Sequence, residues 1–317
     1  MKKVLLKTLL RISVSALLIF LLLRKTDFSA ILNTMHNFSL TNLLAAFLLF
    51  SFTFVILAYK WKILLPEQSL FILIKTILIG HFYSTILPGQ IAGEAAKAYT
   101  LGRGKKNAEV IAASVLIDKI TGLLGLLIVG ISGLFFSRTV VPPTLTISLI
   151  IATFLVVLSL VLIQVKLIFT SILKIFNYLK SVFPKAGKVF SQIELLIHAW
   201  RMYSQKSKIL FYSILFGIAY QVVSIFTSML LAGDLHISVS FFDWSWIAAF
   251  LSFALLIPLS IGGIGIREGT LVGVLAIVGV IPANALALSF SLFAFTVIYA
   301  IVGGIVANSS MFKKVKS

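Results

Sequence analysis

Long uncharged apolar runs alternate along the chain with short segments that carry Lys and Arg. The runs cover 28–59, 76–93, 120–137, 139–165, 209–233, 244–266 and 269–312. They are solidly apolar, without the alternation of apolar and polar positions that is typical of a transmembrane β-strand. A helix that crosses the hydrocarbon core needs about 20 residues with few charges. The pattern therefore predicts an all-α, polytopic bundle of membrane helices.

Composition supports this class, because 60% of the 317 residues are apolar and 11% are charged. In soluble domains roughly 45–50% of the residues are apolar and about 25% are charged. We expect a single integral membrane domain over 1–317. The chain has no Cys, which excludes disulfides and thiolate metal sites. Motifs for nucleotide binding, metal binding or serine hydrolysis are also missing, so we predict no cofactor, no metal and no catalytic residue.

The basic residues predict an orientation, since cytoplasmic loops collect Lys and Arg. The chain has 27 Lys and Arg against 9 Asp and Glu. The segment richest in basic residues, 166–208, lies on the cytoplasmic side if two conditions hold. The N-terminus is cytoplasmic, and two apolar segments enter the membrane and leave it on the same side. Both termini are then cytoplasmic, in the inner membrane. The basic excess lies on no soluble domain, so nucleic acid is not an expected partner.

The two segments that turn back are predicted as re-entrant hairpins over 70–102 and 245–281. About six spanning helices remain. They lie near 4–23, 41–59, 111–136, 144–165, 209–232 and 283–308. The alternative is nine plain crossings with the N-terminus outside, which leaves more basic residues outside. If the hairpins form, each half of the chain contains a span, a hairpin and a second span, and the two halves cross the membrane in opposite directions. This arrangement is the inverted repeat of many transporters.

The two hairpin tips share a pattern of proline, then glycines, then glutamate. Non-helical backbone survives in a bilayer only when it is buried in protein or lines a wet cavity. Ionisable residues inside membrane segments usually mark a pathway for substrate. We therefore predict a central cavity for binding and translocation. The candidate residues are Pro88, Gly89, Gln90, Gly93, Glu94 and Lys97 at the first tip, Asp118 and Lys119 on the next span, and Pro258, Gly262, Gly263, Gly265, Arg267 and Glu268 at the second tip.

Arg267 is the candidate for contact with a lipid phosphate, because its planar fork can bind two oxygens at once. Helix N-termini near Gly93 and Gly265 would add backbone N–H donors. The alternative is a purely structural ion pair between the hairpins, such as Glu94 with Arg267. Asp118 and Lys119 lie either within the lipid or at its interface, depending on where their span begins.

The basic segment 166–208 is predicted to lie on the cytoplasmic surface of the membrane. Over 166–183 its polar residues are spaced three or four apart, with Ile, Leu and Phe between them. This spacing predicts an amphipathic helix that lies flat on the bilayer. After Pro184 the pattern repeats less cleanly.

The two motifs give the chain a family resemblance. The stretches Leu87–Tyr99, with Asp118 and Lys119 after it, and Pro258–Gly269 are similar to the lysylphosphatidylglycerol synthase transmembrane region. This is a flippase-like membrane family, related to the membrane domain of the multiple peptide resistance factor. The family's first motif is closer to Pro-Gly-Arg-x-Gly-Gly-Glu/Asp followed by Arg. Gln90, Ala92 and Lys97 stand here at the places that differ.

The resemblance implies movement of a lipid between leaflets, a phospholipid or an aminoacylated phospholipid. The alternative is an enzyme, a membrane-embedded transferase of the lysylphosphatidylglycerol synthase type, or its non-catalytic membrane subunit. No soluble catalytic domain is expected within 1–317, which favours the transporter. Membrane lipids with anionic headgroups are the expected partners. A separate lipid-modifying enzyme and a second copy of the chain are further candidates.

Overall fold

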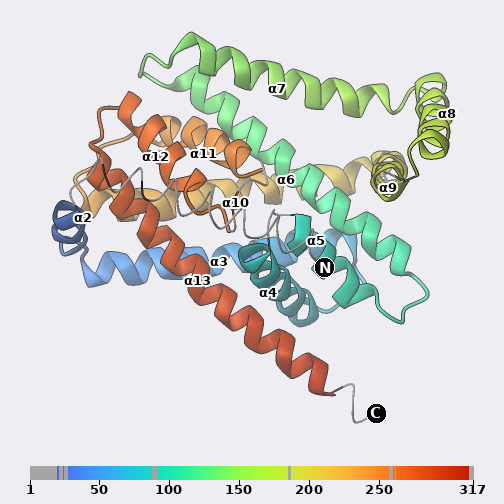
Figure 1. Ribbon diagram of the computed structural model, residues 1–317, viewed down its shortest axis with the longest axis horizontal. Coiled ribbons are helices and arrows are strands. Elements are labelled where there is room, and N and C mark those ends of the chain that lie inside the picture. Colours follow the sequence, from blue (N-terminus) through green and yellow to red (C-terminus); the bar gives the residue numbers. More distant parts are fainter. Residues whose placement is uncertain are drawn as a thin grey trace.

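The computed structural model describes residues 20, 24, 28–87, 91–184, 187–256, 260 and 262–313. Within these residues the regular structure consists of twelve α-helices (Figure 1). In chain order they are α2 (Phe28–Met35), α3 (Leu40–Leu64), α4 (Leu70–Ile86), α5 (Ile91–Gly102), α6 (Ala108–Phe136), α7 (Pro143–Leu162), α8 (Lys166–Val182), α9 (Gly187–Ser204), α10 (Ser207–Asp234), α11 (Phe241–Leu256), α12 (Ile266–Ile277) and α13 (Pro282–Lys313). The predicted all-α class is confirmed.

Five of the described helices are long and apolar enough to cross a membrane: α3, α6, α7, α10 and the Pro282–Ser309 part of α13. They coincide with five of the six predicted spans. The sixth, near 4–23, lies outside the described residues except for position 20. The polytopic bundle is therefore confirmed, while the full number of crossings stays a prediction.

Both predicted hairpins are pairs of helices too short to be counted among these spans. Segment 70–102 forms α4 and α5, and segment 245–281 contains most of α11 and all of α12. Leu87 ends α4 in extended backbone, with φ −96° and ψ 149°. The physical reason is Pro88 in the sequence, because a residue before proline is pushed out of the helical region. That either pair re-enters the membrane, and that the halves form an inverted repeat, remain predictions.

Contacts at the helix ends show how the two pairs are arranged in the molecule. Nζ of Lys62, near the end of α3, donates to the backbone oxygen of Gln68 before α4 at 2.6 Å. Lys105, after α5, donates to the Gln68 side chain at 3.1 Å. The α4/α5 pair therefore starts and ends at one end of the bundle. At the opposite end, Ser137 after α6 donates to Asp243 in the first turn of α11.

The spanning helices cross closely where glycines remove side chains. A methyl group added at Gly125 of α6 would lie 2.7 Å from the backbone carbon of Gly217 in α10. One added at Gly303 of α13 would lie 2.1 Å from the carbonyl oxygen of Leu78 in α4. Gly130 and Gly133 likewise face α11. Small residues let apolar helices approach without polar contacts, and this fixes the bundle around its centre.

Helices α8 and α9 cross one end of the bundle, transverse to α7 and α10 (Figure 1). None of the α8 residues is buried. By contrast, α9 is anchored, because Trp200 donates from Nε1 to the Leu160 carbonyl at 2.9 Å and Tyr203 to that of Leu64 at 3.3 Å. The two predicted helical stretches of 166–208 are confirmed. Their position flat on a membrane surface stays a prediction.

Candidate functional site

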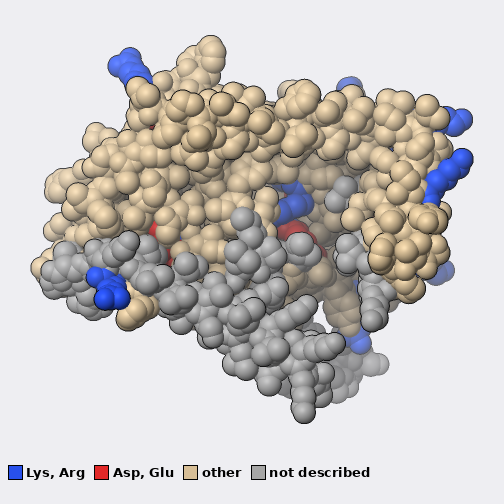
Figure 2. Space-filling view, turned by 45° about the horizontal axis from the view of Figure 1, so that its top comes forward, with Lys and Arg blue, Asp and Glu red and all other residues tan. Residues whose placement is uncertain are grey.

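A cavity of about 430 Å³ lies in the middle of the bundle, among α3, α4, α5, α6, α10, α11, α13 and the turn before α12. On the face shown in Figure 2, a basic and an acidic group lie in a hollow of an otherwise largely uncharged surface. Eight of the fourteen residues predicted for the site line the cavity. They are Gly93, Glu94, Lys97, Asp118, Lys119, Gly262, Gly263 and Arg267.

The other six predicted residues are accounted for as follows. Pro88, Gly89, Gln90 and Pro258 lie outside the described residues. Gly265 and Glu268 are described but do not line the cavity. Residues of both predicted tips and of α6 thus lie around one cavity, and their role in binding stays a prediction.

Helix α5 brings the first group of charged residues to the cavity. It packs against α4 through glycines, and a methyl group added at Gly93 would lie 2.4 Å from the carbonyl oxygen of Gly80. This close contact leaves room for no larger residue at Gly93. Glu94 follows directly in the first turn of α5, and Lys97 lies one turn further. Both side chains therefore reach the space between α4, α5 and α6.

Five charged side chains form a continuous series of ion pairs on this wall. Asp118 lies between two lysines, with Oδ1 3.0 Å from Nζ of Lys60 and Oδ2 3.3 Å from Nζ of Lys97. Nζ of Lys97 lies 2.6 Å from Glu94 Oε2, and Nζ of Lys119 lies 4.0 Å from Glu94 Oε1. Since each carboxylate lies between two cations, the charges compensate one another where water is scarce.

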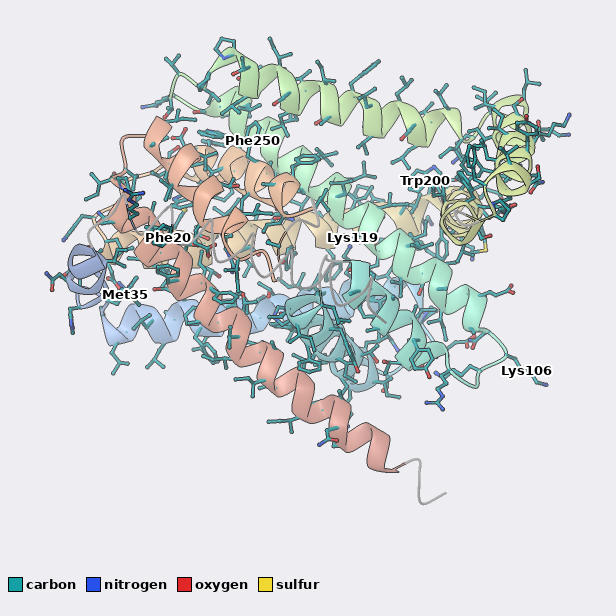
Figure 3. All side chains as sticks on the ribbon, in the orientation of Figure 1. Phe20, Met35, Lys106, Lys119, Trp200 and Phe250 are labelled. Atoms are coloured by element: carbon teal, nitrogen blue, oxygen red, sulfur yellow. The ribbon has the colours of Figure 1, made fainter. Side chains whose placement is uncertain are left out.

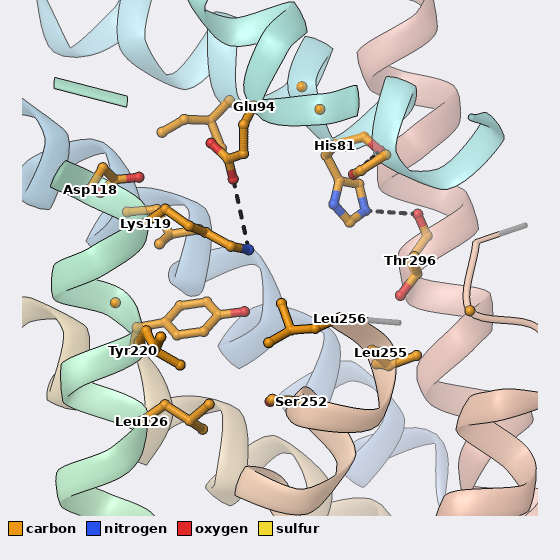
Figure 4. A pocket seen from close by; sticks show the side chains of 18 of the residues that line it. His81, Glu94, Asp118, Lys119, Leu126, Tyr220, Ser252, Leu255, Leu256 and Thr296 are labelled. Carbon is orange, nitrogen blue, oxygen red and sulfur yellow. Dashed lines mark hydrogen bonds and ion pairs between the residues drawn. The ribbon is translucent and has the colours of Figure 1, made fainter. Parts of the chain in front are cut away.

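The series leads from the protein interior to the open part of the cavity. The exposed fraction of the side chain is 2% for Lys60 and 45% for Lys119. Figure 4 shows Lys119 extending into the cavity, joined to Glu94 by a dashed line. In Figure 3 the same residue lies in the middle of the molecule, whereas Lys106 lies at the end of a loop.

Lys60 is a site residue that the sequence prediction did not include, because the predicted span near 41–59 ended just before it. Lys60 lies inside α3, is buried, and also donates to the backbone oxygen of Asp118. Room for its ammonium comes from Gly122, where an added methyl group would lie 3.0 Å from Nζ.

The structure places Asp118 within a long apolar helix, while its depth, in the lipid or at the interface, stays a prediction. Helix α6 begins at Ala108, so Asp118 lies in its third turn, where 8% of the residue is exposed. Its neighbours come from α3 and α5. Asp118 is therefore part of the packed bundle and not of a loop at its end.

The turn before α12 forms the opposite wall of the cavity. Gly262, Gly263 and Gly265 have φ values of 60°, 77° and 87°, in the left-handed region that favours glycine. A methyl group added at Gly262 would lie 2.9 Å from the carbonyl oxygen of Thr85 in α4. The turn of the second helix pair thus rests directly on the first pair, and the cavity lies beside this contact.

Arg267 reaches the cavity from the first turn of α12. It is 7% exposed, and Nη2 donates to the carbonyl oxygen of Gly262 at 3.0 Å. The guanidinium carbon lies 4.4 Å from the centre of the Phe293 ring, a cation–π contact with α13. Nε is buried and has no hydrogen-bond partner among the described residues. Arg267 is therefore held in place while its hydrogen-bonding capacity is incompletely used.

Glu268 has a structural position. Its Oε2 accepts from the backbone N–H of Gly265 at 2.6 Å, and its Oε1 accepts from Ser289 of α13 at 3.2 Å. With 1% of the residue exposed, Glu268 closes the N-terminus of α12 and joins α12 to α13. The expected anion-binding N–H of Gly265 is thus already bonded within the protein.

The ion pair that we considered between the hairpins, Glu94 with Arg267, is not formed in the described structure. Glu94 pairs with Lys97 and Lys119, and Arg267 has its Nε 3.6 Å from Oε1 of Glu268. The charged residues of the two tips therefore pair with different partners.

Polar residues from other helices complete the lining, and the sequence prediction did not include them. Nε2 of His81 lies 3.1 Å from the carbonyl oxygen of Thr296. Since a carbonyl only accepts, this nitrogen carries the proton, and the bond joins α4 to α13. Figure 4 shows the hydroxyl of Tyr220 pointing into the same space. Tyr220 and Gln221 interrupt the apolar run of α10, and that interruption was an available signal.

Comparison with known families agrees with this arrangement. Residues 8–304 match the family described as the lysylphosphatidylglycerol synthase TM region. The chain belongs to this family. The match includes both helix pairs and every residue that lines the cavity. No curated protein and no solved structure matches the chain. Membership of this transmembrane family, together with the five apolar helices, establishes an integral membrane protein.

Proposed function

We propose that this protein moves a lipid between the two leaflets of a membrane, as a flippase-like transporter. The lipid is a phospholipid or an aminoacylated phospholipid, and the membrane is the cytoplasmic one, with both termini inside. The observation that carries the proposal is a charged cavity between two interrupted helix pairs in an otherwise apolar bundle. Charged groups at such depth are costly and usually serve a substrate pathway.

The proposed mechanism is a shielded passage for the headgroup. A lipid headgroup cannot cross hydrocarbon cheaply because its charges lose their hydration. In the cavity, Glu94, Lys119 and Arg267 offer opposite charges in place of water. The acyl chains stay in the surrounding lipid throughout. The chemical bonds of the lipid do not change, so the protein needs to position and release the headgroup, not react with it.

The two helix pairs supply the access routes in this proposal. They open at opposite ends of the bundle and meet at Gly262 and Thr85, beside the cavity. If each pair re-enters the membrane from its own side, the headgroup site lies between two gates. This is the inverted-repeat geometry of alternating-access transporters.

A liposome experiment tests the proposal against the transferase alternative. The purified protein is placed in liposomes that contain headgroup-labelled phosphatidylglycerol, with lysyl-tRNA on one side. We expect labelled lipid to reach the opposite leaflet faster than in empty liposomes, with its mass unchanged. A lysylated product would instead establish a transferase. Exchange no faster than in empty liposomes, for both unmodified and aminoacylated lipid, would reject transport.

Matched variants connect the result to the cavity. Arg267→Gln removes a charge that lines the cavity, and Lys106→Gln removes one from an exposed loop. We expect the first to slow exchange by about tenfold or more, as for loss of one charge-assisted hydrogen bond. The second should leave the rate unchanged. Thermal unfolding of both variants identifies any loss of exchange that reflects misfolding.

A further inference from the structure

The charges that line the cavity are not balanced. Among the described residues, four cationic ones, Lys60, Lys97, Lys119 and Arg267, line the cavity together with two anionic ones, Glu94 and Asp118. This part of the lining thus carries a net charge of +2. Glu268, which lies behind Arg267 and outside the lining, reduces the total to +1 when it is counted.

The cations differ in how far they face the open part of the cavity. Lys60 and Lys97 flank Asp118 at 3.0 and 3.3 Å, and Lys97 lies 2.6 Å from Glu94, inside the bundle. Lys119, which also pairs with Glu94 at 4.0 Å, has 45% of its side chain exposed. Lys119 and Arg267 are therefore the lining cations that a ligand in the cavity would meet first.

Arg267 gives independent support, because it lines the cavity although only 7% of the residue is exposed. Its Nε lies 3.6 Å from Glu268, which is outside the lining, and its Nη2 donates to the carbonyl oxygen of Gly262. A ligand in the cavity would therefore meet the terminal nitrogens and not Nε. A guanidinium fork is suited to binding two phosphate oxygens.

We propose that the cavity selects a headgroup with a net negative charge, with Lys119 and Arg267 as the pair that contacts its phosphodiester. This inference rests on the proposed lipid transport and decides between its two substrate classes. An unmodified anionic phospholipid such as phosphatidylglycerol fits the excess charge. A lysylated headgroup has a net positive charge and is repelled by the same two side chains.

A competition experiment tests the selection. The purified full-length protein is exposed to equal amounts of phosphatidylglycerol, phosphatidylcholine and lysyl-phosphatidylglycerol, and the bound lipid is measured by native mass spectrometry. We expect phosphatidylglycerol to be enriched about tenfold, the effect of one additional charge-assisted hydrogen bond. Equal retention of the three lipids, or a preference for the lysylated one, would overturn the proposal.

Variants assign the selection to the two residues. Lys119→Gln and Arg267→Gln should each remove most of the enrichment, while Lys119→Arg and Lys106→Gln should keep it. Lys119 is partly exposed, so its substitution is compatible with folding even if Arg267→Gln proves unstable. Enrichment that persists in Lys119→Gln would place the phosphodiester elsewhere and contradict the assignment.

Two further arms separate the related hypotheses. Inorganic phosphate at the concentration of the lipid should not displace phosphatidylglycerol; displacement would mean a site for a soluble anion and would overturn the lipid assignment. Leaflet exchange of the same three lipids is measured in parallel. Exchange that ignores headgroup charge refutes the selection but leaves transport intact. Retention of phosphatidylglycerol without any exchange refutes transport but leaves the selection intact.

Discussion

In the α4/α5 pair the glutamate after the glycines, Glu94, faces the cavity, whereas in the α11/α12 pair the corresponding Glu268 is buried and bonded to its own helix N-terminus. The neighbouring cations differ in the same way. Lys97 belongs to a series of five charges from three helices, while Arg267 has one acidic neighbour, Glu268, within the part of the chain that the structure describes. The two similar motifs therefore have different structural roles. The motif of α4/α5 provides a charged wall of the cavity, and the motif of α11/α12 provides a glycine turn followed by the Arg267 guanidinium. Local likeness of sequence does not imply equal roles.

The largest expected effect is a difference in the side of the membrane from which the two helix pairs can be labelled. The chain has no Cys, so single cysteines can be labelled without background. Glu67→Cys and Lys106→Cys flank the first pair, and Ser238→Cys and Ile281→Cys flank the second. We expect an impermeant thiol reagent to label the first two from one side only and the last two from the other. Labels from opposite sides within either pair would mean that the pair crosses the membrane.

The next effect concerns the charged wall. Asp118→Asn leaves Lys60 buried without its carboxylate, which should lower the free energy of unfolding by about 3–5 kcal/mol. Glu109→Gln is the control, because Glu109 is an exposed acid in the first turn of the same helix. Thermal unfolding in detergent measures both. Equal melting temperatures for the two variants would show that the ion pairs do not stabilise the first helix pair.

A glycine substitution tests the glycine turn. Gly262→Ala places a methyl group on a residue with positive φ and against the backbone of Thr85. Gly104 also has a positive φ, but a methyl group there would have no atom within 4 Å, so Gly104→Ala is the control. Both therefore carry the strain, but only the first carries the clash. We expect Gly262→Ala to be less stable than the control by about 1–3 kcal/mol, the usual cost of overpacking. Similar stability in urea unfolding would mean that the two pairs do not rest on each other.

The two glutamates can be compared directly through their amides. Glu268→Gln weakens the bonds that close α12, so it should cost about 1–2 kcal/mol of stability. Glu94→Gln should cost less, because Glu94 has 23% of its side chain exposed and Lys97 keeps Asp118 as a partner. In the liposome assay we expect the reverse order, with Glu94→Gln slower. Identical behaviour of the two variants in both measurements would remove the distinction between the motifs.

The smallest effect is expected at the start of α11, before the predicted hairpin. Burial opposes ionisation of Asp243, but hydrogen bonds from Ser137, Ser240 and Trp246 outweigh it and hold the pKa of its carboxyl below the ordinary value. The resulting stability is present above that ordinary pKa and is lost as the pH falls through the folded-state pKa. Asp243→Asn should therefore lower stability by about 1 kcal/mol near neutral pH. A difference in melting temperature that does not shrink below pH about 4 would contradict this.

Much of the fold could be predicted from the sequence, because the hydrocarbon core imposes length and polarity on a helix. Five predicted spans became long apolar helices, and the end of α4 at Ile86 follows from Pro88 in an apolar run. The spacing of Gly125, Gly130 and Gly133 in the sequence is likewise typical of close helix contacts, and all three pack against other helices. These are local properties, which one segment can show by itself.

The partners of the charged residues could not be predicted, because they depend on how distant helices face one another. Lys60 and Asp118 are 58 residues apart, and nothing local marks them as a pair. The same holds for Gly262 and Thr85, which meet only because both helix pairs reach the centre. Glu268 had a local signal that we gave too little weight: it stands three residues after Gly265, the spacing at which a glutamate closes a helix start.

The contact between Gly262 and Thr85 has a mechanical consequence. Its closest atoms belong to the main chain on both sides, so no long side chain stands between them to change rotamer and absorb a displacement. A shift of the turn before α12 toward α4 would therefore meet main chain, and we expect this turn and the end of α4 to move as one unit.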